Sequence, residues 1–134
     1  MINTLMRFIY IVVLFGLIGC SSSSGDKTAN LPDLPDPLEA GWKGKKVCEV
    51  LVDNADHRIL KCVFPPGVGH EKHYHLPHTG YTLVGGQFEI TDANGTRIVN
   101  VPTGYVFGNE DINIHQVKNV GKTTSEYLII EPKK

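Results

Sequence analysis

The stretch Gly67-Val-Gly-His-Glu-Lys-His-Tyr-His-Leu-Pro-His-Thr-Gly-Tyr-Thr-Leu-Val-Gly-Gly86 holds four of the chain's six histidines within nine consecutive residues. His73 and His75 are separated by one residue, so in an extended strand their side chains leave the same face about 7 Å apart at Cα. Two imidazoles placed like this can bind one ion at the roughly 2.0 to 2.1 Å that a first-row metal requires. The bracketing glycines and Pro77 argue against a helix. The stretch therefore predicts a metal-binding strand.

From residue 46 onward the chain alternates short apolar segments with turns rich in Gly, Pro and Asn, and no segment there has a helical period. Many short strands at regular spacing are typical of an all-β sandwich or barrel. We expect strands at residues 46–53, 57–65, 70–75, 81–84, 87–92, 97–101, 105–108, 112–118 and 125–131.

A third metal ligand is expected from a distant strand, because an ion buried in a barrel is held by its walls. His115 lies forty residues after His75 in the apolar segment 112–117. Period two places it on the same face as Asn113 and Val117. The alternative for such a histidine is a purely structural hydrogen bond to a backbone carbonyl.

These residues resemble the cupin family, small barrels with an internal metal site. The first cupin motif is Gly, five residues, His-x-His, three or four residues, Glu, six residues, Gly; the second ends in His, three residues, Asn. The matching positions here are Gly67, His73, His75, Thr79 and Gly86, followed by His115 and Asn119. The resemblance covers residues 58–131 and implies an all-β cupin jelly-roll barrel, also called a double-stranded β-helix.

One departure from the motif concerns the metal site. Thr79 stands where the family has a ligating Glu, which implies the three-histidine type with ligands His73, His75 and His115. Next to Thr79 in the sequence is His78. It could be a fourth ligand, an acid or base next to the metal, or an exposed loop residue without a role in the site.

The expected cofactor is one divalent transition metal. Imidazole suits iron, zinc, nickel and copper alike, and manganese also stays a candidate. Three neutral imidazoles leave the charge of the ion uncompensated and coordination positions free, which favours an anionic ligand such as a carboxylate, an enolate or hydroxide.

Catalytic residues are unknown at this point, and His78, Tyr81 and Gln87 are the candidates. Tyr81 and Gln87 flank the end of the first motif and are expected to orient a substrate if they point into the barrel. For Tyr81 the alternative is core packing with a hydrogen-bonded hydroxyl.

The N-terminus has a targeting pattern. Arg7 precedes an apolar run at residues 8–18, which is too short for a permanent membrane span of about 20 residues. The following Gly19-Cys20 resembles a bacterial lipobox, which implies a signal peptide at 1–19, lipid attachment to Cys20, a flexible tether at 20–40 and a cupin domain at 41–134. An ordinary signal peptide with a chance cysteine is the alternative.

Export makes a disulfide admissible, because disulfides persist outside the cytosol. If residues 54–56 form a hairpin tip, Cys48 lies opposite Cys62, close enough for a cross-strand bridge. Two buried free thiols remain the alternative. A shift of one residue in the turn would direct the two side chains to opposite faces.

The formal charge of −1 gives no basic footprint for nucleic acid. We expect a cell-envelope lipoprotein, on the periplasmic face of the outer membrane in a diderm, whose cupin domain acts on or binds a small carboxylate or sugar acid. As an enzyme it would be a metal-dependent dioxygenase, isomerase or lyase. The alternatives are a non-catalytic metal- or ligand-binding lipoprotein and a fold without a competent site. Expected partners are the small-molecule ligand, the membrane through Cys20, and a second copy of the chain through the edge strand 46–53.

Overall fold

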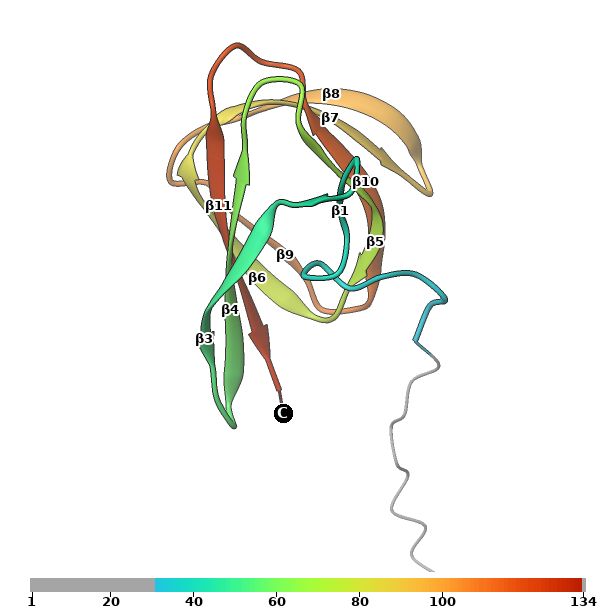
Figure 1. Cartoon of the computed structure of the whole chain (residues 1–134), viewed down its shortest axis with the longest axis vertical. Coiled ribbons are helices and arrows are strands. Elements are labelled where there is room, and N and C mark those ends of the chain that lie inside the picture. Colours follow the sequence, from blue (N-terminus) through green and yellow to red (C-terminus); the bar gives the residue numbers. More distant parts are fainter. Residues whose placement is uncertain (1–30, 134) are drawn as a thin grey trace, which may run out of the picture. The chain divides into compact units, whose positions relative to one another are not determined.

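The computed structural model describes residues 31–133, and its ordered elements are all strands (Figure 1). The predicted all-β fold is confirmed. Within this part of the chain no helix is long and apolar enough to cross a membrane. The expected signal peptide, Cys20 and residues 20–30 of the expected tether lie outside the described residues. The strands are β1 (Gly41–Trp42), β2 (Lys45–Lys46), β3 (Cys48–Asp53), β4 (His57–Phe64), β5 (Gly69–His75), β6 (His78–Val84), β7 (Gly86–Asp92), β8 (Gly95–Val101), β9 (Val106–Asn109), β10 (Asn113–Asn119) and β11 (Ser125–Pro132).

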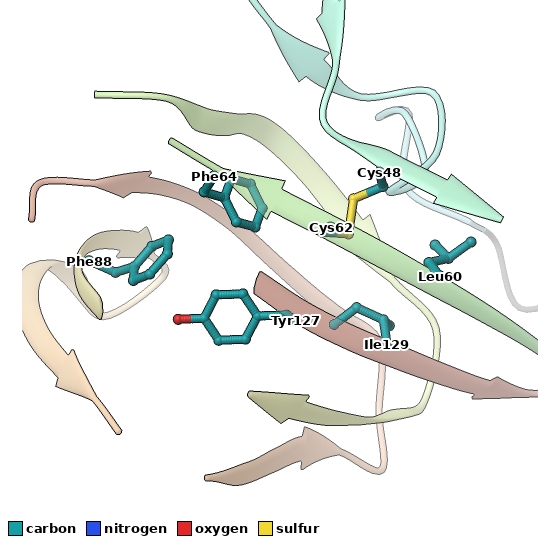
Figure 2. Close-up of a cluster of buried hydrophobic side chains, with 7 residues drawn as sticks. All are labelled: Cys48, Leu60, Cys62, Phe64, Phe88, Tyr127 and Ile129. Atoms are coloured by element: carbon teal, nitrogen blue, oxygen red, sulfur yellow. A yellow bond between two sulfur atoms is a disulfide. The ribbon is translucent and has the colours of Figure 1, made fainter. Parts of the chain in front are cut away.

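Two antiparallel sheets form the barrel. The larger has the order β3-β4-β11-β6-β9, and the smaller has the order β5-β10-β7-β8. Period-two burial assigns the inner faces: in β11 the buried residues Ser125, Tyr127, Ile129 and Glu131 alternate with half-buried ones. The core between the sheets consists of Cys48, Leu60, Cys62, Phe64, Phe88, Tyr127 and Ile129 (Figure 2).

Cys48 and Cys62 pair directly across β3 and β4 and form a disulfide (Figure 2). The hairpin that carries them differs from the expected one. Its turn pairs Asp53 with Arg58, one residue out of the register expected from a tip at 54–56. A β-bulge between Val50 and Val52 adds a residue to β3 and restores the pairing that brings the two cysteines together.

β6 begins at His78, three residues before the expected start. Pro77 and Gly80 look like turn signals in the sequence, but the connection from β5 consists of Leu76 and Pro77 alone. His78 is therefore a strand residue that is 6% exposed. This corrects the reading of His78 as an exposed loop residue.

The segment Leu31–Ala40 was expected to belong to a tether, yet part of it packs on the barrel. Pro37 is fully buried and Ala40 is 3% exposed. The Asp36 carboxylate accepts hydrogen bonds from the amides of Leu38 and Glu39, both at 2.9 Å, and pairs with Arg58 of β4. The ordered domain therefore begins before residue 41.

Candidate metal centre

Strand pairing brings the three predicted ligands together. His73 and His75 point inward from β5, and His115 of β10 pairs directly with His73. Opposed residues on one face of an antiparallel pair have Cβ atoms about 4.5 to 5.5 Å apart. One imidazole nitrogen from each of the three lies within 4.8 Å of the others. The sequence spacing and the fold thus bring these nitrogens close together inside the barrel.

The donor set fits a transition-metal ion. The Nδ1–H of His73 donates to the Glu71 carbonyl at 2.6 Å, which leaves the Nε2 lone pair free. That Nε2 lies 2.9 Å from Nε2 of His75. Two ligands at right angles on one ion, each 2.1 Å away, would be about 3.0 Å apart. Without an ion, one of the two nitrogens must carry a proton and donate it to the other.

Burial keeps these histidines neutral, which is the form that binds metal. Burial, followed by repulsion from the neighbouring histidines, lowers the pKa of His75 and His115 to about 2. Burial also lowers the pKa of His73, against the opposing effect of its hydrogen bond to the Glu71 carbonyl.

Asn113 contacts the ring of His115, because its amide nitrogen Nδ2 lies 3.1 Å from Nδ1 and can donate a hydrogen bond to it. An amide can meet an imidazole nitrogen through either end. Metal binding through Nε2 requires the amide oxygen to accept a proton from Nδ1, so that the lone pair remains on Nε2. A rotation of the Asn113 amide by 180° exchanges its oxygen and nitrogen, and so selects whether Nδ1 or Nε2 of His115 carries the proton.

His78 lies beside the cluster without belonging to it. Its Nδ1–H donates to the Leu76 carbonyl at 2.9 Å, and its ring centroid is 4.5 Å from that of His75. Thr79, at the position of the family's Glu, is exposed. The next residue, Gly80, is buried, and a Cβ there would lie 2.2 Å from the ring of Phe107. β6 therefore contributes no carboxylate to the site, and an aromatic ring fills the space over Gly80.

A cavity of about 700 Å³ adjoins the cluster. It is lined by β8 and β9, one edge strand from each sheet, and by residues of the barrel interior. Aromatic and aliphatic side chains form its interior wall, and exposed polar ones lie among the lining residues of the β7–β8 turn, of β8 and of β9. The interior wall includes Phe64, Phe88, Ile90, Val99, Phe107, Val117, Tyr127 and Ile129, and the exposed polar residues include Asn94, Arg97, Asn100 and Asn109.

Tyr81 and Gln87 do not line this cavity. Strand alternation turns Tyr81 outward between the buried residues Gly80 and Thr82, and it is 40% exposed. Gln87 precedes the buried Phe88 and donates from Nε2 to Asn100 at 3.0 Å. This placement corrects the expectation that either side chain orients a substrate inside the barrel.

Several residues near the centre escaped the sequence analysis. Glu131 is 3% exposed, and its Oε1 lies 3.8 Å from Nδ1 of His75, with neither atom hydrogen-bonded. His70 is 3% exposed and stacks on His73 with centroids 3.8 Å apart. Tyr127 lines the cavity with an unpartnered hydroxyl. Alternation within residues 125–131 was the available signal, since it puts Tyr127 and Glu131 on one face.

Solved structures share this fold. A cupin domain from Bordetella pertussis superposes with a TM-score of 0.62 at 21% identity, over 66% of this chain and 93% of that one. The polyketide cyclase RemF from Streptomyces resistomycificus superposes with a TM-score of 0.58 at 17% identity, over 76% of this chain and 75% of that one. A protein with a double-stranded β-helix domain from Klebsiella pneumoniae superposes with a TM-score of 0.55 at 18% identity, over 67% of this chain and 79% of that one. No family model and no curated protein matches the sequence.

At these identities the likeness shows the fold alone. The chain therefore has the cupin fold, with a cluster of three histidines inside its barrel, of which His73 and His75 are buried and His115 is half-buried. What the cluster binds has to be argued from its own chemistry.

Proposed function

We propose that the domain binds one divalent transition-metal ion through His73, His75 and His115 and offers the free coordination positions to a small carboxylate in the adjoining cavity. The observation that carries this proposal is the convergence of three neutral imidazoles, those of His73 and His75 buried and that of His115 half-buried, whose ligand nitrogens lie within 4.8 Å of one another next to a cavity. The ion, when bound, supplies Lewis-acid chemistry and an attraction for anions.

The chain's own residues define the rest of the ligand. No carboxylate of β6 reaches the site, so an anionic head group would balance the charge of the ion. The mostly apolar interior wall favours an apolar body over the many hydroxyls of a sugar acid. The unpartnered hydroxyl of Tyr127 can satisfy a polar atom of the ligand.

The ligand class is tested by calorimetric titration of the Zn²⁺-loaded protein with benzoate, hexanoate and gluconate. We expect the first two to bind more tightly than gluconate, and binding to disappear in His115→Ala. Preference for gluconate would favour the sugar acid. Failure of all three carboxylates to bind would contradict the proposal.

A second measurement separates an enzyme from a binding protein. Oxygen uptake by the Fe²⁺-loaded protein is recorded with each carboxylate, and His115→Ala serves as the blank. Uptake above the blank would identify an oxygen-dependent enzyme, and product analysis without oxygen would detect an isomerase or lyase. Tight carboxylate binding without turnover would identify a carrier or sensor.

The cell-envelope location is part of the proposal. It is supported by the N-terminal pattern that ends in Gly19-Cys20 and by the Cys48–Cys62 disulfide, which fits an oxidising compartment. Radiolabelled palmitate should be incorporated into the full chain and not into Cys20→Ser, which should leave the membrane fraction. We also propose a homodimer through the edge strand β3, and sedimentation equilibrium tests it.

A further inference from the structure

A strap of three residues, Pro35 to Pro37, lies along the back of the histidine cluster. The amide of Tyr74, between the two ligands of β5, donates to the Pro35 carbonyl at 3.2 Å. β5 is an edge strand of its sheet, so the strap occupies hydrogen-bonding groups that would otherwise be free. The next two residues of the strap each start a connection to one metal ligand.

The first connection runs from Asp36 to His75. The Asp36 carboxylate accepts from Arg58 Nη1 at 2.8 Å, and Arg58 Nε donates to Glu131 Oε2 at 2.6 Å. Two N–H groups of one planar guanidinium thus orient both carboxylates. The second oxygen of Glu131, Oε1, lies 3.8 Å from Nδ1 of His75.

The two facing atoms have no other partner and are buried. When Nε2 of His75 binds an ion, the proton of the neutral ring must be on Nδ1, and Glu131 Oε1 is the acceptor that faces it. A buried N–H and a buried carboxylate oxygen left apart would both stay unsatisfied. The geometry therefore prepares a carboxylate-to-histidine hydrogen bond behind the metal.

The second connection runs from Pro37 to His73. Nε2–H of His70 donates to the Pro37 carbonyl at 3.0 Å, and the His70 ring lies against that of His73 at 3.8 Å between centroids, with an interplanar angle of 32°. His73 is itself fully buried. Its ring is held between this stack and its own bond to Glu71.

We propose that the strap belongs to the metal site: it positions His75 through Arg58 and Glu131, and His73 through His70, and so sets the affinity and geometry of the ion without touching it. This inference rests on the proposed function, because it presupposes that the three histidines bind metal. Asp36, Arg58, His70 and Glu131 are then positioning residues.

The test is titration of the full-length protein with Co²⁺, read by its visible absorption spectrum and by competition with a chelator. Glu131→Gln and Asp36→Asn should each weaken Co²⁺ affinity about 10- to 100-fold and shift the absorption band. In the double variant the losses should be less than multiplicative, because Asp36 acts on His75 only through Arg58 and Glu131.

The matched control is Glu126→Gln. Glu126 is on the same strand as Glu131 and forms an ion pair of 2.8 Å with Lys61 on the outer face. Loss of this pair should leave Co²⁺ affinity within about twofold of the wild type, since a half-exposed pair contributes little. His70→Phe keeps an aromatic ring but removes the link to Pro37, and should weaken binding too.

The outcomes separate the two proposals. A wild-type protein that does not bind Co²⁺ refutes the metal site itself. A wild type that binds, with Asp36→Asn and Glu131→Gln equal to it in affinity and spectrum, refutes the role of the strap alone. Should Glu131→Gln fail to fold, as judged by near-ultraviolet circular dichroism, Asp36→Asn decides, because Asp36 is at the surface with 22% of its side chain exposed.

Discussion

At the residue scale, the site is built from imidazoles that the fold keeps uncharged. His70, His75 and His115 each have a pKa lowered to about 2, first by burial and then by repulsion from neighbouring histidines. Near pH 6.5 these residues therefore take up protons in the unfolded chain, where their pKa has its ordinary value of about 6.5, whereas in the folded chain they stay neutral at this pH.

This difference predicts that the metal-free protein loses stability on mild acidification. The folded pKa lies below the unfolded one, so stability is full above pH 6.5 and falls as the pH drops below it. Between pH 7.5 and 5.5 each of the three histidines should cost about 1.4 kcal/mol. Urea unfolding in the presence of a chelator measures the effect. Stability that stays constant across this interval would show that the rings are accessible to protons in the folded state.

The hydroxyl of Tyr127 is expected to favour carboxylate binding without contributing to the stability of the fold. This hydroxyl has no protein partner, and burial raises the pKa of this side chain above its ordinary range. Tyr127→Phe should leave the free energy of unfolding unchanged or raise it by about 1 kcal/mol, while weakening carboxylate binding. Tyr105→Phe, at a residue that is 51% exposed, is the control for urea unfolding. A loss of stability in Tyr127→Phe would mean that the hydroxyl is already satisfied in the folded protein.

Some residues of the site can be predicted from the sequence and others cannot. His73, His75 and His115 could be predicted because a dense motif and period-two alternation constrain them. The Asp36–Arg58–Glu131 connection could not, since its members are 22 and 73 positions apart and meet only when β4 pairs with β11. Local pattern contains no information on which strands become neighbours in a barrel.

At the element scale, two register shifts of one residue cancel in the hairpin of β3 and β4, one at its turn and one at its β-bulge. The sequence predicted the partner of Cys48, but from a turn that is one residue different from the real one. A bulge is an insertion of one residue whose position depends on packing across the sheet, so the sequence alone does not reveal it. The start of β6 escaped prediction because Pro77 and Gly80 resemble turn residues.

The disulfide in this hairpin should stabilise the domain. It closes a loop with a sequence separation of 14, for which the constraint on the unfolded chain is worth about 3 kcal/mol. The double variant Cys48→Ala, Cys62→Ala should lower the free energy of unfolding by about 2 to 3 kcal/mol, measured by urea. Equal stability of the wild type with and without a reductant would contradict this expectation.

At the scale of the whole molecule, metal binding and folding are coupled. The cluster joins β5 and β10, which only the folded chain brings into register, so an ion should bind the native state preferentially. Free Zn²⁺ at 100 times its dissociation constant should stabilise the protein by about 2.7 kcal/mol and raise Tm. His73→Ala with His75→Ala should remove this dependence. A Tm that does not respond to Zn²⁺ in the wild type would contradict the coupling.

The stoichiometry of Co²⁺ binding by the wild type and by His115→Ala decides whether the three histidines form one metal site. His115 decides because it comes from a strand forty residues away from His75 and reaches the cluster only through the fold. We expect one ion per chain in the wild type and no detectable ion at micromolar concentrations in His115→Ala. Binding of the ion by His115→Ala with unchanged affinity and stoichiometry would contradict this prediction.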